Sequence, residues 1–338
     1  MQQFSFPKGK SENRKEPAEV VLVVNPNSAS GKTGKNWDTL FSEIRKILGS
    51  EVDFAFTAKP GDGTTITRNL IRQGVKRIIP IGGDGTINEV ANGFFEEQVG
   101  IRNSSDKLKP INPDAAMGVV PSGTRNVLAR SLGLNSDLLE CFGCFVHGKP
   151  TKIDVVAVSA TNPSSGELNP ARIFLNAAEM GIAGELVDRS KKVRGTLNSR
   201  LISTITAAVA TVPSYESNLC DIDLDNGRER LLAKMTLGIV ANGKYLGGGF
   251  KAAPLADVYD GLFDLVVLKD SGSFKILDEL VKMKSGDYRN EGDIIYLQGK
   301  DALVRSKERD VTVTIDGEPA GILPAEFSVH EGSLSVVL

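Results

Sequence analysis

A glycine-rich segment between an apolar run and a helical pattern is the strongest chemical signal in the sequence. It reads Pro80-Ile-Gly-Gly-Asp-Gly-Thr-Ile-Asn88. Glycine lets backbone N–H groups approach a ligand closely, and a turn that opens a helix favours anions such as phosphate. A dinucleotide-binding fingerprint needs a third glycine where Asn88 stands, so that fingerprint is incomplete. The segment predicts a phosphate-binding turn with Asp84 as a candidate Mg²⁺ ligand, the alternative being a tight turn capped by Thr86.

Two further polar turns follow predicted strands in the same half of the chain. The first, Asn25-Pro-Asn-Ser-Ala-Ser-Gly31, leads into Lys32, but Pro26 replaces the first glycine of a P-loop, which argues against a P-loop NTPase. The second, Pro121-Ser-Gly-Thr-Arg-Asn126, opens a helix. Because the carboxyl ends of parallel strands meet at one edge of a sheet, three such turns predict a nucleotide crevice, with Lys32 as a phosphate contact.

Acidic turns mark the second half of the chain. Asp257-Val-Tyr-Asp260-Gly261 precedes an apolar run and predicts either a cation loop or a hairpin turn with Gly261 at positive φ. Asp316-Gly-Glu318 follows the predicted strand at 311–315, and a carboxylate there could act as general base towards an alcohol. Taken alone, this turn is more typical of an exposed Asp-Gly hairpin.

Length and composition indicate a globular protein with two domains. The chain has 338 residues, and its 40 basic and 42 acidic side chains exclude a globally basic nucleic-acid binder. Three cysteines exclude a disulfide framework, and Cys141 and Cys144 with His147 lack a fourth zinc ligand unless Cys220 joins them, so buried thiols are the preferred interpretation. Residues 1–17 lack a signal-peptide core, and no run reaches about 18 apolar residues, so we expect a cytoplasmic protein with a polar N-terminal tail.

Strands and helices alternate in the first half of the chain. This order predicts a doubly wound parallel sheet in an α/β domain. The predicted strands lie at 19–24, 52–56, 77–81 and 117–120, and the predicted helices at 37–48, 64–72, 86–93 and 124–132.

Strand patterns dominate after residue 150 and predict an antiparallel β-sandwich. We therefore expect a tail at 1–17, a nucleotide-binding α/β domain at 18–150 and a substrate domain at 151–338, with the active site in the cleft between the two domains. The predicted strands lie at 153–158, 172–177, 234–241, 262–268, 293–297, 311–315 and 334–338, and the predicted helices at 185–192, 201–212 and 273–283.

Taken in order, these motifs resemble the diacylglycerol kinase catalytic-domain family, which includes sphingosine kinases and bacterial lipid kinases and is distantly related to NAD kinases. The resemblance runs from about Val20 to Val329. It rests on an ordered series of motifs: Asn25-Pro26, Ser28 to Gly31, Gly61-Asp62, Gly82 to Glu89, Pro121 to Asn126, Asn242-Gly243, Gly247 to Gly249, Pro254, Ala256, Asp260-Gly261 and Asp316 to Glu318.

The resemblance implies an ATP- and Mg²⁺-dependent kinase that phosphorylates a lipid hydroxyl, above all that of diacylglycerol, to give phosphatidic acid. It implies Glu318 as proton acceptor with Asp316 beside it, and Asp84 as a residue that helps place the catalytic Mg²⁺. A second, structural cation would be held by Asp257, Asp260 and Leu262. The implied ATP-binding residues are Asn25, Pro26, Asn27, Ser28, Gly31, Lys32, Thr57, Gly82, Gly83, Asp84, Gly85, Thr86, Ile87, Asn88, Thr124 and Asn126.

Other acceptors and partners stay open at this point. A sphingoid base, a soluble alcohol or a non-catalytic nucleotide-binding role are the alternatives, and the presence of the three catalytic carboxylates argues against the last. The apolar stripe predicted at 201–212 is either a membrane-approach element or a core helix. Val127 stands where many bacterial members of the family have Asp. We expect peripheral membrane contact and no nucleic-acid partner, and leave a homodimer open.

Overall fold

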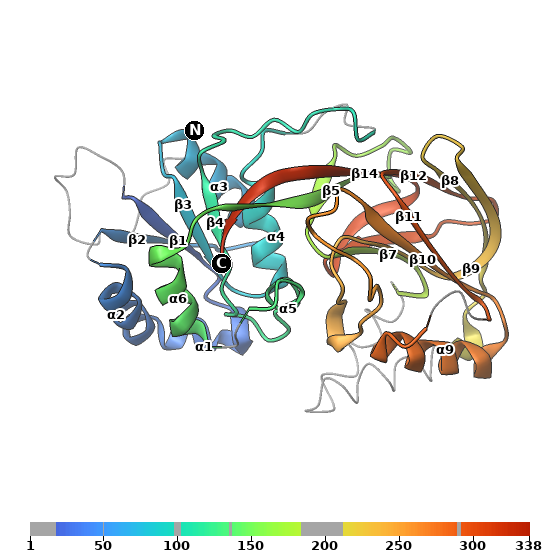
Figure 1. Cartoon of the computed structure of the whole chain (residues 1–338), viewed down its shortest axis with the longest axis horizontal. Coiled ribbons are helices and arrows are strands. Elements are labelled where there is room, and N and C mark those ends of the chain that lie inside the picture. The colour runs from blue at the N-terminus through green and yellow to red at the C-terminus, as the bar shows by residue number, and fades with distance from the viewer. Residues whose placement is uncertain (1–17, 50, 98–102, 135–136, 184–211, 289–291) are drawn as a thin grey trace. The chain divides into compact units, whose positions relative to one another are not determined.

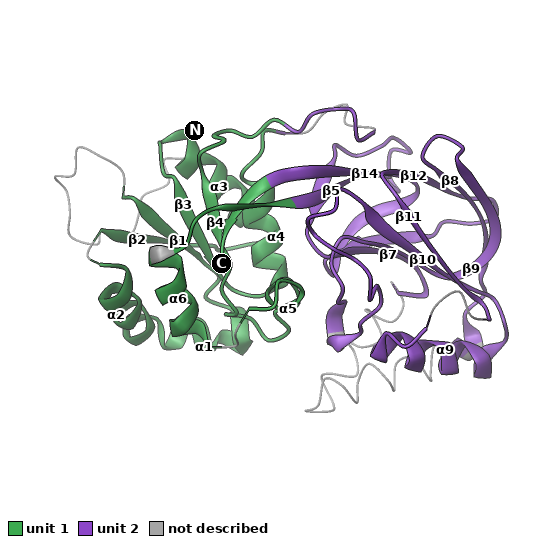
Figure 2. Ribbon diagram, in the orientation of Figure 1, with its two compact units in different colours: residues 1–96, 109–153, 334–338 green, residues 97–108, 154–333 purple. Residues whose placement is uncertain are grey.

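The computed structural model describes residues 18–338, apart from 50, 98–102, 135–136, 184–211 and 289–291. The chain divides into two compact units (Figure 2). Unit 1 comprises residues 1–96, 109–153 and 334–338, and unit 2 comprises residues 97–108 and 154–333. The chain therefore passes between the units at 96/97, 108/109, 153/154 and 333/334, and its last residues belong to unit 1. The predicted tail, the predicted helix at 185–192 and the predicted helix at 201–212, apart from its last residue, lie outside the described residues.

A parallel sheet forms the centre of unit 1. Its strand order is β4-β3-β1-β2, and the end of the long strand β14 (Glu318–Val337) continues the sheet in parallel beside β4. Strand β1 is buried along its whole length, as expected where helices cover both faces of a sheet. The first strands are β1 (Val20–Val24), β2 (Val52–Phe56), β3 (Arg77–Ile81) and β4 (Ala116–Gly118).

Helices cover both faces of this sheet (Figure 1). Helices α2 (Trp37–Leu48) and α6 (Leu138–His147) pack on the face that carries Leu22, where Ile44 and Phe142 complete the core. The opposite face is covered by α3 (Asp62–Arg72) and α4 (Asp84–Asn92). Two short helices, α1 (Lys32–Lys35) and α5 (Val127–Ser131), follow the turns after β1 and β4.

Unit 2 is built on antiparallel strand pairs. Six strands pair in a closed ring in the order β9-β7-β13-β14-β12-β8, with β8 returning to β9, because the long strands β9 and β14 each pair with several neighbours. The strands are β5 (Thr151–Thr161), β6 (Arg172–Phe174), β7 (Ala177–Gly181), β8 (Asn218–Leu224), β9 (Glu229–Ala241), β10 (Phe263–Lys269), β11 (Ile294–Gly299), β12 (Asp301–Ser306), β13 (Thr312–Ile315) and β14.

Apolar side chains pack on both faces of these strands. One cluster gathers residues such as Phe174, Met235 and Phe327, all at most 1% exposed. On the other face, helix α9 (Ser273–Ser285) covers β9 and β10 with Ile276 and Leu280. Among the described helices, none is long and apolar enough to cross a membrane.

Some predicted boundaries are wrong, and each error has a physical cause. The helix predicted from 124 begins only at Val127, because Asn126 has a left-handed φ of 49°. The strand predicted at 172–177 is two strands, since β6 ends at Phe174 and β7 begins at Ala177. Strands β8 and β12 were not predicted. The helix predicted from 86 already begins at Asp84.

Candidate functional site

The turns after β1 and β3 are hydrogen-bonded to each other. The Asn25 N–H donates to the Ile81 carbonyl at 2.8 Å, and Nδ2 of Asn25 donates to Oγ1 of Thr86 at 3.3 Å. Thr57, at the end of β2, donates its N–H to the Val24 carbonyl at 2.8 Å. The structure thus brings together three of the predicted nucleotide-site residues at the carboxyl edge of the sheet.

The turn after β1 has an unusual backbone. Ala29, Ser30 and Gly31 have successive φ values of 50°, 60° and 80°, a conformation that costs energy for the two non-glycine residues. Hydrogen bonds hold it in place: Oγ of Ser28 lies 2.6 Å from Oγ1 of Thr33. Strained backbone of this kind concentrates at binding sites, which agrees with the predicted role of the turn.

The turn after β4 lies directly against the glycines after β3. Oγ of Ser122 accepts the Gly82 N–H at 2.8 Å and lies 3.0 Å from the Gly82 carbonyl oxygen, to which it donates. A Cβ on Gly123 would lie 2.8 Å from Cα of Gly83, so only glycine permits this approach. Asn126 closes the turn by accepting the Gly123 N–H at 2.8 Å.

Asp84 connects α4 to α5 through its carboxylate. Its Oδ1 accepts the Val127 N–H at 2.7 Å, and its side chain is buried. Burial raises the pKa of Asp84, and the Val127 hydrogen bond and the charge of Arg125 oppose that rise. The residue predicted to help place Mg²⁺ therefore also fixes the two turns relative to each other.

The remaining predicted nucleotide residues differ in exposure. Ile87 and Asn88 are each 2% exposed, so their side chains belong to the interior of unit 1. Thr124 and Lys32 are exposed.

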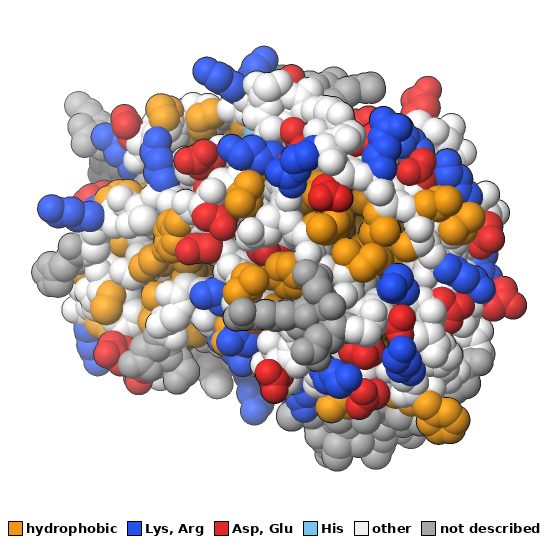
Figure 3. All heavy atoms as spheres, turned by 45° about the vertical axis from the view of Figure 1, so that its right-hand side comes forward, with side chains coloured by type: hydrophobic (Ala, Val, Ile, Leu, Met, Phe, Trp, Pro, Cys, Tyr) orange, Lys and Arg blue, Asp and Glu red, His pale blue; other side chains and the backbone are white. Residues whose placement is uncertain are grey.

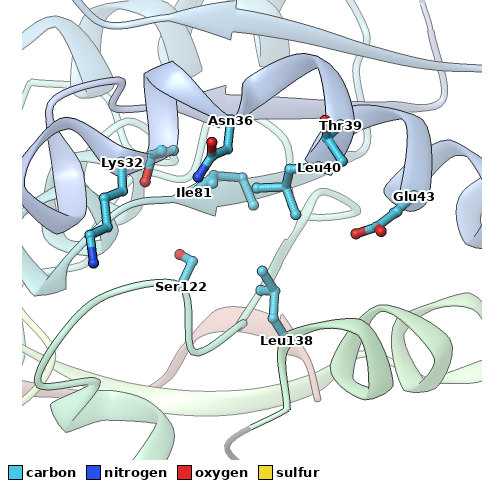
Figure 4. Close-up of a pocket in the computed structure, with 9 residues that line it drawn as sticks. Lys32, Asn36, Thr39, Leu40, Glu43, Ile81, Ser122 and Leu138 are labelled. Carbon is cyan, nitrogen blue, oxygen red and sulfur yellow. The ribbon is translucent and has the colours of Figure 1, made fainter.

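A pocket of about 420 Å³ borders these turns within unit 1. Lys32 and Ser122 lie towards one end and Glu43 towards the other, with apolar side chains between them (Figure 4). Five of its lining residues were not predicted from the sequence, because they come from two segments that are distant along the chain. Those residues are Asn36, Thr39, Leu40, Glu43 and Leu138.

In unit 2, the Asp316-Gly317 turn holds Glu318 at the surface. Asp316 and Gly317 have φ values of 47° and 87°, and Ile315 pairs with Glu318, which defines a two-residue hairpin turn. The Asp316 carboxylate accepts the N–H groups of Leu175 and Asn176, which connect β6 to β7, each at 3.0 Å, and that of Ala177, the first residue of β7, at 3.1 Å. Asp316 thus anchors the turn, whereas the Glu318 side chain is exposed.

The predicted cation loop is braced by its own backbone. Oδ1 of Asp257 accepts the Tyr259 N–H at 3.1 Å, and Oδ1 of Asp260 accepts the Leu262 N–H at 2.9 Å. Burial raises the pKa of Asp260, and the nearby charge of Asp257 adds to the rise. Within the described ranges, no three or more His, Cys, Asp or Glu side chains gather as a metal site, so the cation site stays a prediction.

Asp154, which was not predicted as a site residue, ties this loop to β14 at Gly332. Asp154 is 1% exposed, and its two carboxylate oxygens accept the N–H groups of Gly261 and Gly332, each at 2.7 Å. The only local sign of this role in the sequence is that Asp154 is a charged residue within a strand that is predicted to be buried.

Comparison with known proteins gives two consecutive matches along the chain. Residues 19–158 match the diacylglycerol kinase catalytic domain, and residues 180–338 match the YegS C-terminal NAD kinase beta sandwich-like domain. The chain is thus an enzyme of the lipid-kinase type, with a diacylglycerol kinase catalytic domain in its first half. This kinase is 27% identical over 308 residues to a diacylglycerol kinase of Bacillus subtilis, with 90% of this chain and 91% of that protein covered. It is 25% identical to a diacylglycerol kinase of Staphylococcus saprophyticus, with 90% of each covered.

Solved structures share the fold of this kinase. Two crystal structures from Bacillus anthracis align with TM-scores of 0.72 and 0.66 at 22% and 21% identity. The first alignment covers 97% of each chain. The second covers 96% of this chain and 98% of the other chain, which is named a diacylglycerol kinase. The predicted resemblance to diacylglycerol kinases and the predicted lipid-kinase type of enzyme are confirmed. The prediction of a mixed α/β half followed by a β-sandwich-like half is confirmed as well. The position of the active site between the domains stays a prediction.

Proposed function

We propose that this protein transfers the γ-phosphate of ATP to the hydroxyl group of diacylglycerol and forms phosphatidic acid. The observation that carries the proposal is the joining of the turns after β1, β3 and β4 in a chain with a diacylglycerol kinase catalytic domain. In the reaction the lipid oxygen bonds to the γ-phosphorus, the bond from that phosphorus to the β–γ bridging oxygen breaks, and ADP leaves. The hydroxyl proton passes to a carboxylate.

Residues of unit 1 would bind the phosphates of ATP. The N-terminus of α4 begins at Asp84 after two glycines, and the N–H groups of such a helix start favour negative charge. Lys32 adds a positive charge at the adjoining end of the pocket. Mg²⁺ bound with ATP supplies further neutralisation of phosphate charge, and Asp84 would hold it. The Val127 N–H orients the carboxylate for that task.

In unit 2, Glu318 would accept the hydroxyl proton. A carboxylate can act as general base when it is presented to the acceptor, and Glu318 is exposed at the first residue of β14. Asp316 is a positioning residue in this proposal, because its oxygens already accept three backbone N–H groups.

The acceptor would be reached at a membrane surface, with peripheral contact only. Phe274 and Val281 of α9 are 92% and 69% exposed and lie two helical turns apart on one face. Exposed apolar side chains of this kind can enter the headgroup region of a bilayer. On the face drawn in Figure 3, basic and acidic side chains are interspersed with hydrophobic patches, in keeping with the small net charge of −2.

The test is transfer of labelled γ-phosphate from ATP and Mg²⁺ into vesicles that contain diacylglycerol. Wild type and Glu318→Gln are compared with a matched control, Glu229→Gln, because Glu229 is likewise an exposed first residue of a strand. We expect labelled phosphatidic acid from wild type and the control, and a loss of about 100-fold or more for Glu318→Gln.

The other outcomes each contradict a different part of the proposal. Label in a sphingoid base or in a water-soluble alcohol, but not in diacylglycerol, would show that the acceptor is wrong. Full activity of Glu318→Gln would show that another group takes the proton, while the kinase function stands.

A further inference from the structure

Arg125 lies in a turn that is fixed on both of its sides to the segment after β3, Gly82 to Asp84. Two residues before it, Gly123 lies against Gly83, where an added Cβ would be 2.8 Å from Cα. Two residues after it, the Val127 N–H donates to Oδ1 of Asp84 at 2.7 Å. The backbone that carries Arg125 is therefore held beside the predicted phosphate-binding segment by contacts that do not involve the arginine side chain.

The side chain of Arg125 remains available to a ligand in this position. It is exposed, and its positive charge acts on Asp84, whose pKa it lowers against the larger effect of burial. A guanidinium that is close to Asp84 and still open to solvent is placed to meet an anion that binds at the same turn.

Phosphoryl transfer requires positive charge beside the γ-phosphoryl group of ATP. As the bond to the β–γ bridging oxygen breaks, negative charge grows on the departing ADP and is spread over the γ-phosphoryl oxygens. Lys32 supplies a point charge from the turn after β1, whereas the planar guanidinium of an arginine can donate two parallel hydrogen bonds to phosphate oxygens. Arg125 would supply this second cation from the turn after β4.

We propose that Arg125 binds the γ-phosphoryl group of ATP and stabilises the charge that develops on it during transfer, an inference that rests on the proposed kinase function. The arginine keeps its proton throughout and donates only hydrogen bonds, so the bonds made and broken are those of the phosphoryl transfer itself. In this proposal Arg125 is a catalytic residue in addition to Asp84 and Glu318.

The first test compares Arg125→Ala and Arg125→Lys with wild type in the vesicle assay. The control is Arg72→Ala, because Arg72 pairs with Glu96 at the far end of α3, about 16 Å of helix away from the turns. We expect Arg125→Ala to lower kcat about 100-fold or more, with KM for ATP changed less than about tenfold. Arg125→Lys should retain part of the activity, and added guanidinium ion at low concentration should partly restore Arg125→Ala.

The second test needs no lipid acceptor. Binding of ADP with Mg²⁺, and of ADP with Mg²⁺ and aluminium fluoride as a mimic of the transferring phosphoryl group, is measured by calorimetry for wild type and Arg125→Ala. We expect a loss of at least about tenfold for the aluminium fluoride complex and less than about threefold for ADP. Thermal unfolding of each variant shows whether it is folded.

The inference is overturned if Arg125→Ala keeps kcat within about threefold of wild type, or if it weakens both nucleotide complexes equally. If wild type fails to phosphorylate diacylglycerol, the proposed acceptor is wrong, and the calorimetric comparison still decides the role of Arg125.

Discussion

The backbone N–H of Val127 and the carboxylate of Asp84 are joined by a hydrogen bond of 2.7 Å between the first residues of α5 and α4. The contact uses the main chain at position 127, so the valine side chain does not prevent it. The turns after β3 and β4 are thereby held together at both the Ser122–Gly82 contact and this one. A nucleotide bound by one turn would meet the other in a fixed position.

Two substitutions of Asp84 should distinguish its role in stability from its role in activity. Asp84→Ala leaves a buried N–H without its acceptor and should lower the free energy of unfolding by about 1–3 kcal/mol, measured by denaturant titration. Asp84→Asn keeps an acceptor oxygen and should lose less than about 1 kcal/mol, yet it should lose phosphoryl transfer if the charge helps to place Mg²⁺. Equal activity of Asp84→Asn and wild type would contradict that role.

The close approach of Gly123 to Gly83 should be needed for nucleotide binding. Gly123→Ala would place Cβ 2.8 Å from Cα of Gly83 and 3.0 Å from Oδ1 of Asn126. Because the turn must shift to relieve this contact, ATP affinity should fall at least about tenfold by calorimetry. Gly143→Ala on α6 is the control, since its Cβ would meet nothing within 4 Å. An affinity for ATP that Gly123→Ala leaves intact would show that the turn is not a binding element.

Substitution of Asp316 should destabilise the protein strongly, whereas substitution of Glu318 should leave its stability almost unchanged. Asp316→Ala removes the acceptor of three backbone N–H groups and should lower the free energy of unfolding by about 2–4 kcal/mol. Asp316→Asn should lose less, because asparagine tolerates the left-handed φ of 47° and keeps one acceptor. Glu318→Gln, at an exposed position, should change the free energy of unfolding by less than about 0.5 kcal/mol. Thermal and denaturant unfolding would test this, and a large loss for Glu318→Gln would mean that Glu318 is structural.

The stability of unit 2 should depend on pH through Asp264. Asp264 of β10 is 1% exposed, and burial raises its pKa to about 6 from 3.8, although Tyr296 and Gln298 lower it by hydrogen bonding. The folded state therefore favours the protonated form. The stabilisation of the folded state by protonated Asp264 is complete below about pH 4 and is lost as the pH rises through about 6.

Asp264→Asn should remove this dependence. Between pH 4 and pH 7.5, the change in unfolding free energy of wild type should exceed that of Asp264→Asn by roughly 2–3 kcal/mol. Asp114→Asn, which alters an exposed carboxyl group in a turn, serves as the control. Parallel pH profiles for wild type and Asp264→Asn would refute the assignment.

Local patterns predicted the elements of unit 1 well. The continuous apolar run that forms β1 and the glycines before Asp84 carry their structural signal within a few residues. Contacts between distant residues could not be predicted in this way. Asp154 binds N–H groups of Gly261 and Gly332, more than 100 residues further along the chain, and the partners of Asp316 precede it by about 140 residues.

Contacts between distant residues also explain the errors in the elements predicted for unit 2. The segment at 172–177 reads as one strand, but the N–H groups of Leu175 and Asn176 bind Asp316, so the ladder is interrupted there. The pocket residues Glu43 and Leu138 are distant in sequence and were missed for the same reason.

The path of β14 has a consequence for how the protein is made. The nucleotide-binding half finishes its sheet with Val336 and Val337 beside β4, and these two residues are translated after every residue of unit 2. That half therefore cannot be completed by the first 153 residues during synthesis, and loss of the residues after 333 would damage the domain that is translated first. Late truncations should thus impair nucleotide binding while the remote strands of unit 2 are intact.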